Sequence, residues 1–286
     1  MKLLVRGDDF GFTKAVTYGI VDAIDNGVLR NTGLFTNMPS SALAASMVDG
    51  RDEVCFGIDF NIVAGKPVSD PKDVPHLVDE NGNFIRSGRR VSDPRYQSEE
   101  GQNELFPYDE VYRELKAQYD RFLELRHGVK PGYLHPHSIM PVSYIRAIRQ
   151  LSQETGIPFS MDIQKKYGFV SVFTFKKQDF TKTMNTKVFD PMAQLNKNPL
   201  KDVQDYSDQL LASPYVEIGG HPGFVDADLL DHTTLSLERV RDHAMMTSDW
   251  IKNWVKDNSS ELITYRDRSA LKQNRRYGSG FYICIK

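Results

Sequence analysis

The sequence predicts an α/β fold, a single-domain (β/α) barrel like a TIM barrel but irregular, with about seven strands. Short apolar runs alternate with helical patterns along most of the chain, and such alternation implies parallel strands joined by right-handed crossovers. The 286 residues show no linker and no internal repeat, and barrel folds reach this length as one domain. Six or seven strand–helix units favour a closed or nearly closed barrel, and a doubly wound sheet is the alternative.

The expected strands are apolar runs that end at turn-forming residues. The helices between them are expected where apolar residues recur at helical spacing, as at Val16, Ile20 and Ile24, with Thr13 as the N-cap. We predict strands at residues 3–6, 29–38, 55–62, 132–137, 158–162, 216–220 and 262–265. We predict helices from residue 13 to 26 and at residues 40–47, 111–122, 142–155, 203–211 and 237–255.

Two segments fit no regular element. Residues 63–105 form a long excursion rich in Pro, Gly, Asp and Arg, and long loops in compact domains are usually functional or mobile. Residues 164–198 carry a stretch rich in Lys and Phe that predicts no clear element. We nevertheless expect residues 1–286 to form one domain.

Composition excludes several classes of protein. The formal net charge is −2, so the chain lacks the basic character of proteins that bind nucleic acid or an anionic membrane. The first apolar stretch is too short for a signal peptide or a membrane span, which predicts a cytoplasmic protein. Cys55 and Cys284 are too few for a disulfide framework and are expected to be buried thiols.

Carboxylates follow two of the predicted strands. Asp8 and Asp9 come directly after the first strand, and Asp59 lies in the third. Buried carboxylates are costly unless a cation or a proton offsets them. By itself, the Asp8–Asp9 pair fits a solvated turn with a helix cap as well as it fits a functional site. Asp59 by itself fits a structural ion pair.

Imidazoles follow two other strands. His135 and His137 are two residues apart and point the same way on a strand, and His221 ends a later strand just before Pro222. Packed or surface histidines would give the same short motifs. In a barrel, however, the carboxyl ends of all strands converge on one face. Mixed Asp and His side chains there suit a divalent metal and leave acid and base groups for hydrolysis.

These residues resemble the motifs of the YdjC-like carbohydrate deacetylases, which include the chitooligosaccharide deacetylases called ChbG. The segment from Arg6 to Gly11 resembles the family's Ala-Asp-Asp-Phe-Gly signature, and the segment from His221 to Asp226 resembles its His-Pro-Ala-Phe-Ile/Val-Asp block. Further matches, in order along the chain, are Asn26-Gly27-Val28, Asn31-Thr32, Gly65-Lys66-Pro67-Val68, Leu77-Val78-Asp79 with Gly82 and Phe84, residues 128–131, and Arg239.

The resemblance implies a role for each matching residue. Asp8 resembles the general base and His221 the catalytic acid that protonates the leaving amine. Asp9 resembles the first metal ligand, and His137 falls on the histidine ligand of the family's Asp-Ser-His motif. Arg239 matches an arginine that we place beside the metal ligands or the substrate.

Two positions depart from the family pattern. The Gly-x-His strand, whose histidine binds metal, reads Gly57-Ile58-Asp59, and Asp-Ser-His reads His135-Pro136-His137. The two changes exchange an acid and a histidine between neighbouring positions, which would preserve the charge of the site. We expect Asp59 to replace the histidine ligand and His135 to lie beside the metal site or in the substrate pocket.

The resemblance therefore implies a metal-dependent hydrolase that releases acetate from a small N-acetylated amino sugar or oligosaccharide. The expected cofactor is one divalent ion, Mg²⁺ or Zn²⁺, with Mn²⁺ also compatible. No nucleic acid or membrane partner is expected, and the long excursion could join a homodimer. Two alternatives remain: a non-catalytic sugar-binding protein with a degenerate site, and a metal-dependent sugar isomerase or epimerase.

Overall fold

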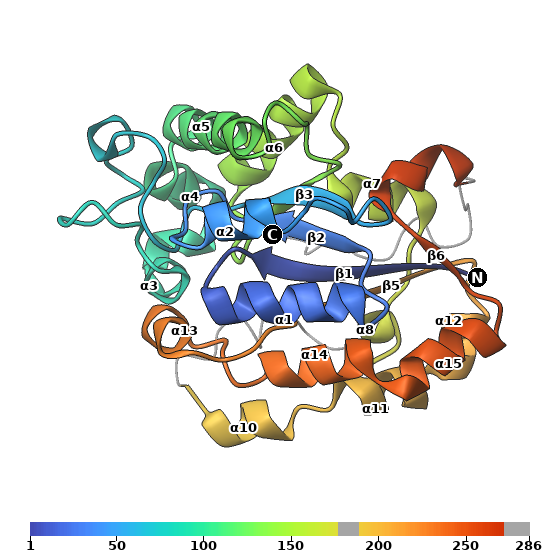
Figure 1. The fold of residues 1–286 in the computed structure, drawn as a ribbon. Helices are drawn as coiled ribbons and strands as arrows, with labels where there is room; N and C mark the ends of the chain where they lie inside the picture. Colours follow the sequence, from blue (N-terminus) through green and yellow to red (C-terminus); the bar gives the residue numbers. More distant parts are fainter. Residues whose placement is uncertain (177–188, 272–286) are drawn as a thin grey trace.

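A computed structural model describes residues 1–176 and 189–271, and its centre is a six-stranded sheet in which every pairing is parallel. The order is β4-β3-β2-β1-β5, with β6 paired to the first residues of β1. The sheet curls into a half-barrel surrounded by helices (Figure 1), so the barrel-like α/β prediction is confirmed. The strands are β1 Lys2–Phe10, β2 Asn31–Leu34, β3 Cys55–Phe60, β4 Leu134–Pro136, β5 Tyr215–Gly220 and β6 Glu261–Ile263.

Most of the predicted helices are present. Helix α1 begins after Thr13, whose hydroxyl accepts the Val16 N–H at 3.3 Å, and it ends at Asn26. The helices are α1 Lys14–Asp25, α2 Ser41–Ser46, α3 Ser87–Ser92, α4 Glu99–Leu105, α5 Tyr108–Leu125, α6 Val142–Thr155, α7 Ser160–Tyr167, α8 Val172–Lys176, α10 Pro191–Asn196, α11 Pro199–Asp205, α12 Ser207–Leu211, α13 Ala227–His232, α14 Arg239–Thr247 and α15 Asp249–Asp257. The helix expected at residues 237–255 is two helices, because Ser248 is extended and caps α15.

The strand predicted at residues 158–162 is wrong. Phe159 makes one isolated bridge to Leu134, and α7 begins at the next residue. Ile163 and Tyr167, one helical turn apart, bury their side chains inside the half-barrel. After α7, Val170 bridges to Val216 of β5. The segment therefore crosses from one edge of the sheet to the other with a helix in place of a strand.

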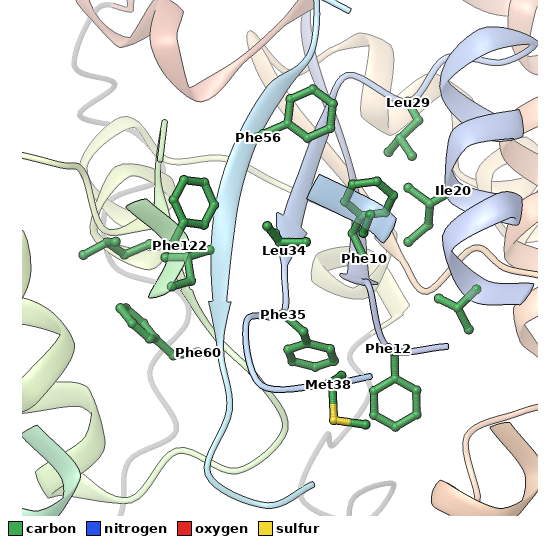
Figure 2. Close-up of a cluster of buried hydrophobic side chains, with 14 of the residues drawn as sticks. Phe10, Phe12, Ile20, Leu29, Leu34, Phe35, Met38, Phe56, Phe60 and Phe122 are labelled. Atoms are coloured by element: carbon green, nitrogen blue, oxygen red, sulfur yellow. The ribbon is translucent and has the colours of Figure 1, made fainter. Parts of the chain in front are cut away.

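Side chains alternate between two cores. Phe10, Leu34 and Phe56 belong to the larger core on the outer face of the sheet (Figure 2), where helices such as α1 cover it. Leu4 and Tyr133 belong to a smaller core inside the half-barrel. Because strand residues alternate between faces, Arg6 and Asp8, two and four residues after Leu4, also face the interior. The alternation ends there, since the pairing of β1 with β2 shifts register before Phe10.

The excursion at residues 63–105 is not wholly irregular, since it contains α3, α4 and two short 3₁₀ helices, Pro71–Asp73 and Pro94–Gln97. Glu114 of α5 is fully buried and accepts the N–H groups of Val68 at 3.0 Å and Ser69 at 2.9 Å. Arg86 donates to the carbonyl of Asp231, in α13, at 2.9 Å. The excursion is therefore fixed at its start and reaches α13, the helix that follows β5.

Other expectations have mixed outcomes. Cys55 is a buried free thiol, as predicted, whereas Cys284 lies outside the described residues. The Lys- and Phe-rich stretch contains α8 and α10, and residues 177–188 between them are not described. Among the described helices, none has the length and apolar character required to cross a membrane.

Candidate active site

Two adjacent carboxylates lie at the carboxyl end of β1, and both are buried. Asp8 continues the inward alternation of Leu4 and Arg6. Asp9 has a positive φ of 74°, and the pairing of β1 with β2 shifts register between Gly7 and Phe10. A non-glycine residue in this region is strained and persists where its surroundings enforce it. The turn at Asp9 breaks the strand alternation at the site.

Asp9 is surrounded by cationic and imidazole groups. Its Oδ2 accepts a hydrogen bond from Arg239 at 2.6 Å, and its Oδ1 lies 2.9 Å from His137 Nδ1. Arg239 comes from the first turn of α14 and is 1% exposed. Burial raises the pKa of Asp9, but His137 and Arg239 outweigh burial and hold it well below its ordinary value. The carboxylate is therefore ionised.

A second group lies deeper in the half-barrel, around Arg6. Its guanidinium donates to Asp8 through one nitrogen and to Glu217 of β5 at 3.0 Å through Nε. The nitrogen that contacts Asp8 also lies 2.6 Å from His135 Nε2, and His135 Nδ1 lies 2.7 Å from the hydroxyl of Ser160. Burial raises the pKa of Asp8 to about 6, although Arg6 opposes the rise. Burial also lowers the pKa of His135 well below its ordinary value, with Arg6 acting in the same direction.

Asp59 links the two groups. Its Oδ2 accepts the backbone N–H of Asp9 at 2.9 Å, while its Oδ1 is buried and has no hydrogen-bond partner among the described residues. Burial, and next the charge of Asp8, raise the pKa of Asp59 well above its ordinary value. Gly33 of β2 leaves the space that this carboxylate occupies, since a Cβ there would lie 1.8 Å from Oδ1.

His221 follows β5 on the far side of the site. Its backbone N–H donates to Asp242 of α14 at 2.9 Å, and Lys197 contacts the same carboxylate at 3.1 Å. Burial lowers the pKa of His221 to about 3, against the opposing charge of Asp9. The imidazole is therefore neutral in the free protein.

The predicted residues meet at the carboxyl end of the sheet, but two sets of three could hold a cation. In one set, Asp8, Asp59 and His135, the potential ligand atoms all lie within 4.8 Å of one another. The other set is the predicted one, Asp9, Asp59 and His137. The Asp9 carboxylate lies 2.9 Å from His137 Nδ1, but Asp59 contacts the backbone N–H of Asp9, and the three side chains do not form so close a cluster of ligand atoms as the first set among the described residues. The sets share Asp59.

The charges of the site fit a divalent cation. The linked groups contain four carboxylates, those of Asp8, Asp9, Asp59 and Glu217, and two guanidinium groups, those of Arg6 and Arg239. With every carboxylate ionised and the imidazoles neutral, two negative charges remain. The buried oxygen Asp59 Oδ1 has no hydrogen bond, and a buried unpaired carboxylate is costly. One divalent ion would offset the two negative charges and give Asp59 Oδ1 a partner.

The sequence analysis did not identify several polar residues of the site. Arg6 and Glu217 could have been found from strand alternation, because each precedes a predicted site residue by an even number of positions. Ser160 and Asp242 gave no such signal, since their contacts depend on how α7 and α14 pack against the sheet.

Comparison with known proteins identifies the family of this chain. The family model described as YdjC-like protein matches residues 2–257. The chain belongs to the YdjC-like family. It is 32% identical to carbohydrate deacetylase 2 of Listeria innocua, over 93% of this chain and 98% of that protein. It is 28% identical to the chitooligosaccharide deacetylase of Klebsiella pneumoniae, over 93% of this chain and 98% of that protein.

A solved structure shares the fold. It is a protein of Enterococcus faecalis described as a cellobiose-phosphate cleavage protein, 22% identical to this YdjC-like chain, with a TM-score of 0.71. The alignment covers 95% of this chain and 99% of that protein. At this identity the likeness concerns the fold alone.

Proposed function

We propose that this YdjC-like protein is a carbohydrate deacetylase that hydrolyses the N-acetyl group of a small amino sugar and releases acetate. The names of its relatives support the reaction class. The observation that carries the proposal is the meeting of Asp8, Asp9, His137 and His221 at the carboxyl end of one sheet, with unpaired carboxylate charge between them. Active sites of barrel folds form at that end.

Asp9, Asp59 and His137 are the residues that we propose hold a divalent ion. Asp59 Oδ1 is a buried oxygen without a hydrogen bond, and Asp9 Oδ1 faces His137 Nδ1 at 2.9 Å. When bound, the ion would polarise the acetamide carbonyl and lower the pKa of water. Two carboxylates and one imidazole are compatible with Mg²⁺, Mn²⁺ or Zn²⁺.

Asp8 is the proposed general base. Its pKa of about 6 lies near neutrality, where a base is both ionised and able to accept a proton. Arg6 restricts the carboxylate from one side, so that the proton of the attacking water would pass to an oxygen held in place. Arg239 would keep Asp9 ionised and oriented beside it.

His221 is the proposed acid for the leaving nitrogen. Burial keeps its imidazole neutral before substrate binds. Negative charge that develops on the substrate beside it raises the pKa of an imidazole, so His221 would take up a proton from solvent and pass it to the amine, while Asp8 later releases the proton of the attacking water to solvent. The Asp242 carboxylate holds the His221 backbone for this step.

The proposal is tested by acetate release. Asp8→Asn and His221→Ala are each expected to lower turnover of N-acetylated mono- and disaccharides by at least about 100-fold, the lower range for a general acid or base. Asp120→Asn and His127→Ala are the matched controls, because both residues are exposed. A sugar isomer without acetate as the product would instead identify an isomerase.

A parent protein that binds the sugar without releasing acetate in the presence of Mg²⁺, Mn²⁺ or Zn²⁺ would favour a non-catalytic binding protein. Unchanged turnover in either variant would remove that residue from the mechanism. The sugar chain length, the homodimer and the cytoplasmic location stay predictions.

A further inference from the structure

The guanidinium of Arg6 occupies a central position beneath the site. One of its terminal nitrogens contacts both the Asp8 carboxylate and His135 Nε2, the latter at 2.6 Å, while Nε donates to Glu217 at 3.0 Å. The side chains of Arg6 and Glu217 are 11% and 12% exposed. Arg6 is therefore a buried cation with three polar partners.

These contacts determine the state of His135. A guanidinium offers only donors, so His135 Nε2 must accept, and His135 Nδ1 then carries the proton that it donates to Ser160. A metal ion would need the same Nε2 lone pair. It would also need the Asp8 carboxylate, to which Arg6 already donates. Arg6 thus engages two of the three groups in the Asp8–Asp59–His135 cluster.

In the set of Asp9, Asp59 and His137, two carboxylate oxygens receive no hydrogen bond from a described cationic side chain. Arg239 binds Asp9 through Oδ2 and leaves Oδ1 facing His137. Asp59 Oδ1 likewise has no hydrogen bond. No described guanidinium or ammonium group donates a hydrogen bond to either oxygen. The two sets share Asp59, but in the Asp8 set a guanidinium also occupies the imidazole lone pair that an ion would need, whereas in the Asp9 set Arg239 binds only one oxygen of Asp9.

We propose that Arg6 is a positioning residue that serves as a fixed cation beneath the site and closes the Asp8–Asp59–His135 cluster to metal. Arg6 directs the ion to Asp9, Asp59 and His137 and leaves Asp8 outside the metal site. This inference rests on the proposed function for the placement of the ion, but it concerns binding and is tested without substrate.

The first experiment removes the cation while keeping the net charge. Arg6→Gln combined with Glu217→Gln deletes one positive and one negative charge, and both amides retain hydrogen-bonding capacity. Calorimetric titration with Mn²⁺ is expected to give one more ion per chain in this double variant than in the parent. Adding His135→Ala should abolish the extra ion. Arg6→Lys is the matched control, because it keeps a cation and should show no extra ion.

The result that overturns the proposal is an unchanged number of ions in the double variant. Circular dichroism and urea unfolding establish that the variant is folded. If it is not, substitutions in the otherwise native protein decide. His135→Ala should leave the Mn²⁺ affinity within about twofold, whereas His137→Ala should weaken it by at least the roughly 10-fold seen even for outer partners of a metal. Equal losses in both would refute the assignment of Arg6.

The role of Arg6 in catalysis has a separate readout. If Arg6 positions Asp8, Arg6→Lys should lower kcat while leaving KM for the sugar within about twofold. A lower kcat together with a higher KM would indicate a general structural defect. Acetate release could fail in the parent and the Mn²⁺ titrations would still be informative. Failure of the proposed function and failure of this inference are therefore distinguishable.

Discussion

Gly33→Ala should displace the Asp59 carboxylate without removing any group of the site. A Cβ at Gly33 would lie 1.8 Å from Asp59 Oδ1 and 2.2 Å from Cγ. Contacts between non-bonded heavy atoms settle near 3.5 Å, so the carboxylate must retreat by roughly 1.7 Å. Gly33 has no positive φ, so alanine adds no backbone strain. The effect of the substitution is then the collision itself.

The displacement should weaken metal binding and stability together. Asp59 Oδ2 accepts the Asp9 N–H at 2.9 Å, and a retreat of that size breaks the bond or moves Asp9. We expect the Mn²⁺ affinity to fall by at least 10-fold, as for loss of a group that orients metal ligands. Overpacking of a buried site costs about 1–3 kcal/mol in the free energy of unfolding.

The assays are calorimetric titration with Mn²⁺ and urea unfolding of the metal-free protein. Gly88→Ala is the matched control, because nothing lies within 4 Å of its added Cβ; it should leave the Mn²⁺ affinity unchanged and should not lower stability, since alanine is favoured over glycine within helix α3. The double variant Gly33→Ala with Asp59→Ala tests the mechanism. If the collision is the cause, the destabilisation by Gly33→Ala should largely disappear when the carboxylate is absent.

Two results would refute this reasoning. A Gly33→Ala protein with the parent's Mn²⁺ affinity would show that Asp59 is not part of the metal site. Equal destabilisation in the presence and absence of the Asp59 carboxylate would show that the collision does not cause the cost.

Three further predictions concern a buried ion pair, the bound metal and a buried thiol. Arg239→Met removes the guanidinium that pairs with the buried Asp9 carboxylate, so urea unfolding should show a loss of about 3–5 kcal/mol, whereas Arg51→Met, at an exposed ion pair with Asp25, should cost less than about 1 kcal/mol. Removing bound metal with a chelator should lower the thermal unfolding midpoint, and restoring Mn²⁺ should recover it, since the ion binds the folded chain; an identical midpoint would contradict the metal proposal. Burial raises the pKa of Cys55 to about 11, so the folded protein keeps a proton that the unfolded chain releases near about 8.5; stability should fall between these pH values, and less steeply in Cys55→Ala.

Strands and helices were predictable where the apolar pattern had a single interpretation. The run from Cys55 to Phe60 is bounded by turn residues and forms β3, and the spacing of Val16, Ile20 and Ile24 gives α1. Residues 158–162 failed because a run of five residues is compatible with both periods. The outcome depended on Ile163 and Tyr167, which bury one face of α7 inside the half-barrel.

The predicted site residues meet because topology brings strand ends together, and topology follows from alternating elements. Which carboxylate faces which partner was not predictable in the same way. Strand alternation alone would put Asp8 and Asp9 on opposite faces, but Asp9 has a positive φ and turns toward His137 and Arg239. That conformation is enforced by tertiary contacts and leaves no periodic signal in the sequence.

The exchange of acid and histidine that the family resemblance implies at Asp59 and His135 is understandable only with Arg6 included. Taken alone, a histidine replaced at position 59 and an acid replaced at position 135 would leave the charge of the site unchanged. Arg6, however, donates to His135 Nε2, so that imidazole acts as an acceptor for a guanidinium and Asp59 supplies the unpaired carboxylate oxygen. If Asp59 holds the ion as proposed, the exchange separates a metal ligand at position 59 from a histidine at position 135 that is already bound by a side-chain cation. The sequence suggested the exchange, but only the contacts of Arg6 indicate that His135 binds a guanidinium and that Asp59 is left for the proposed metal ion.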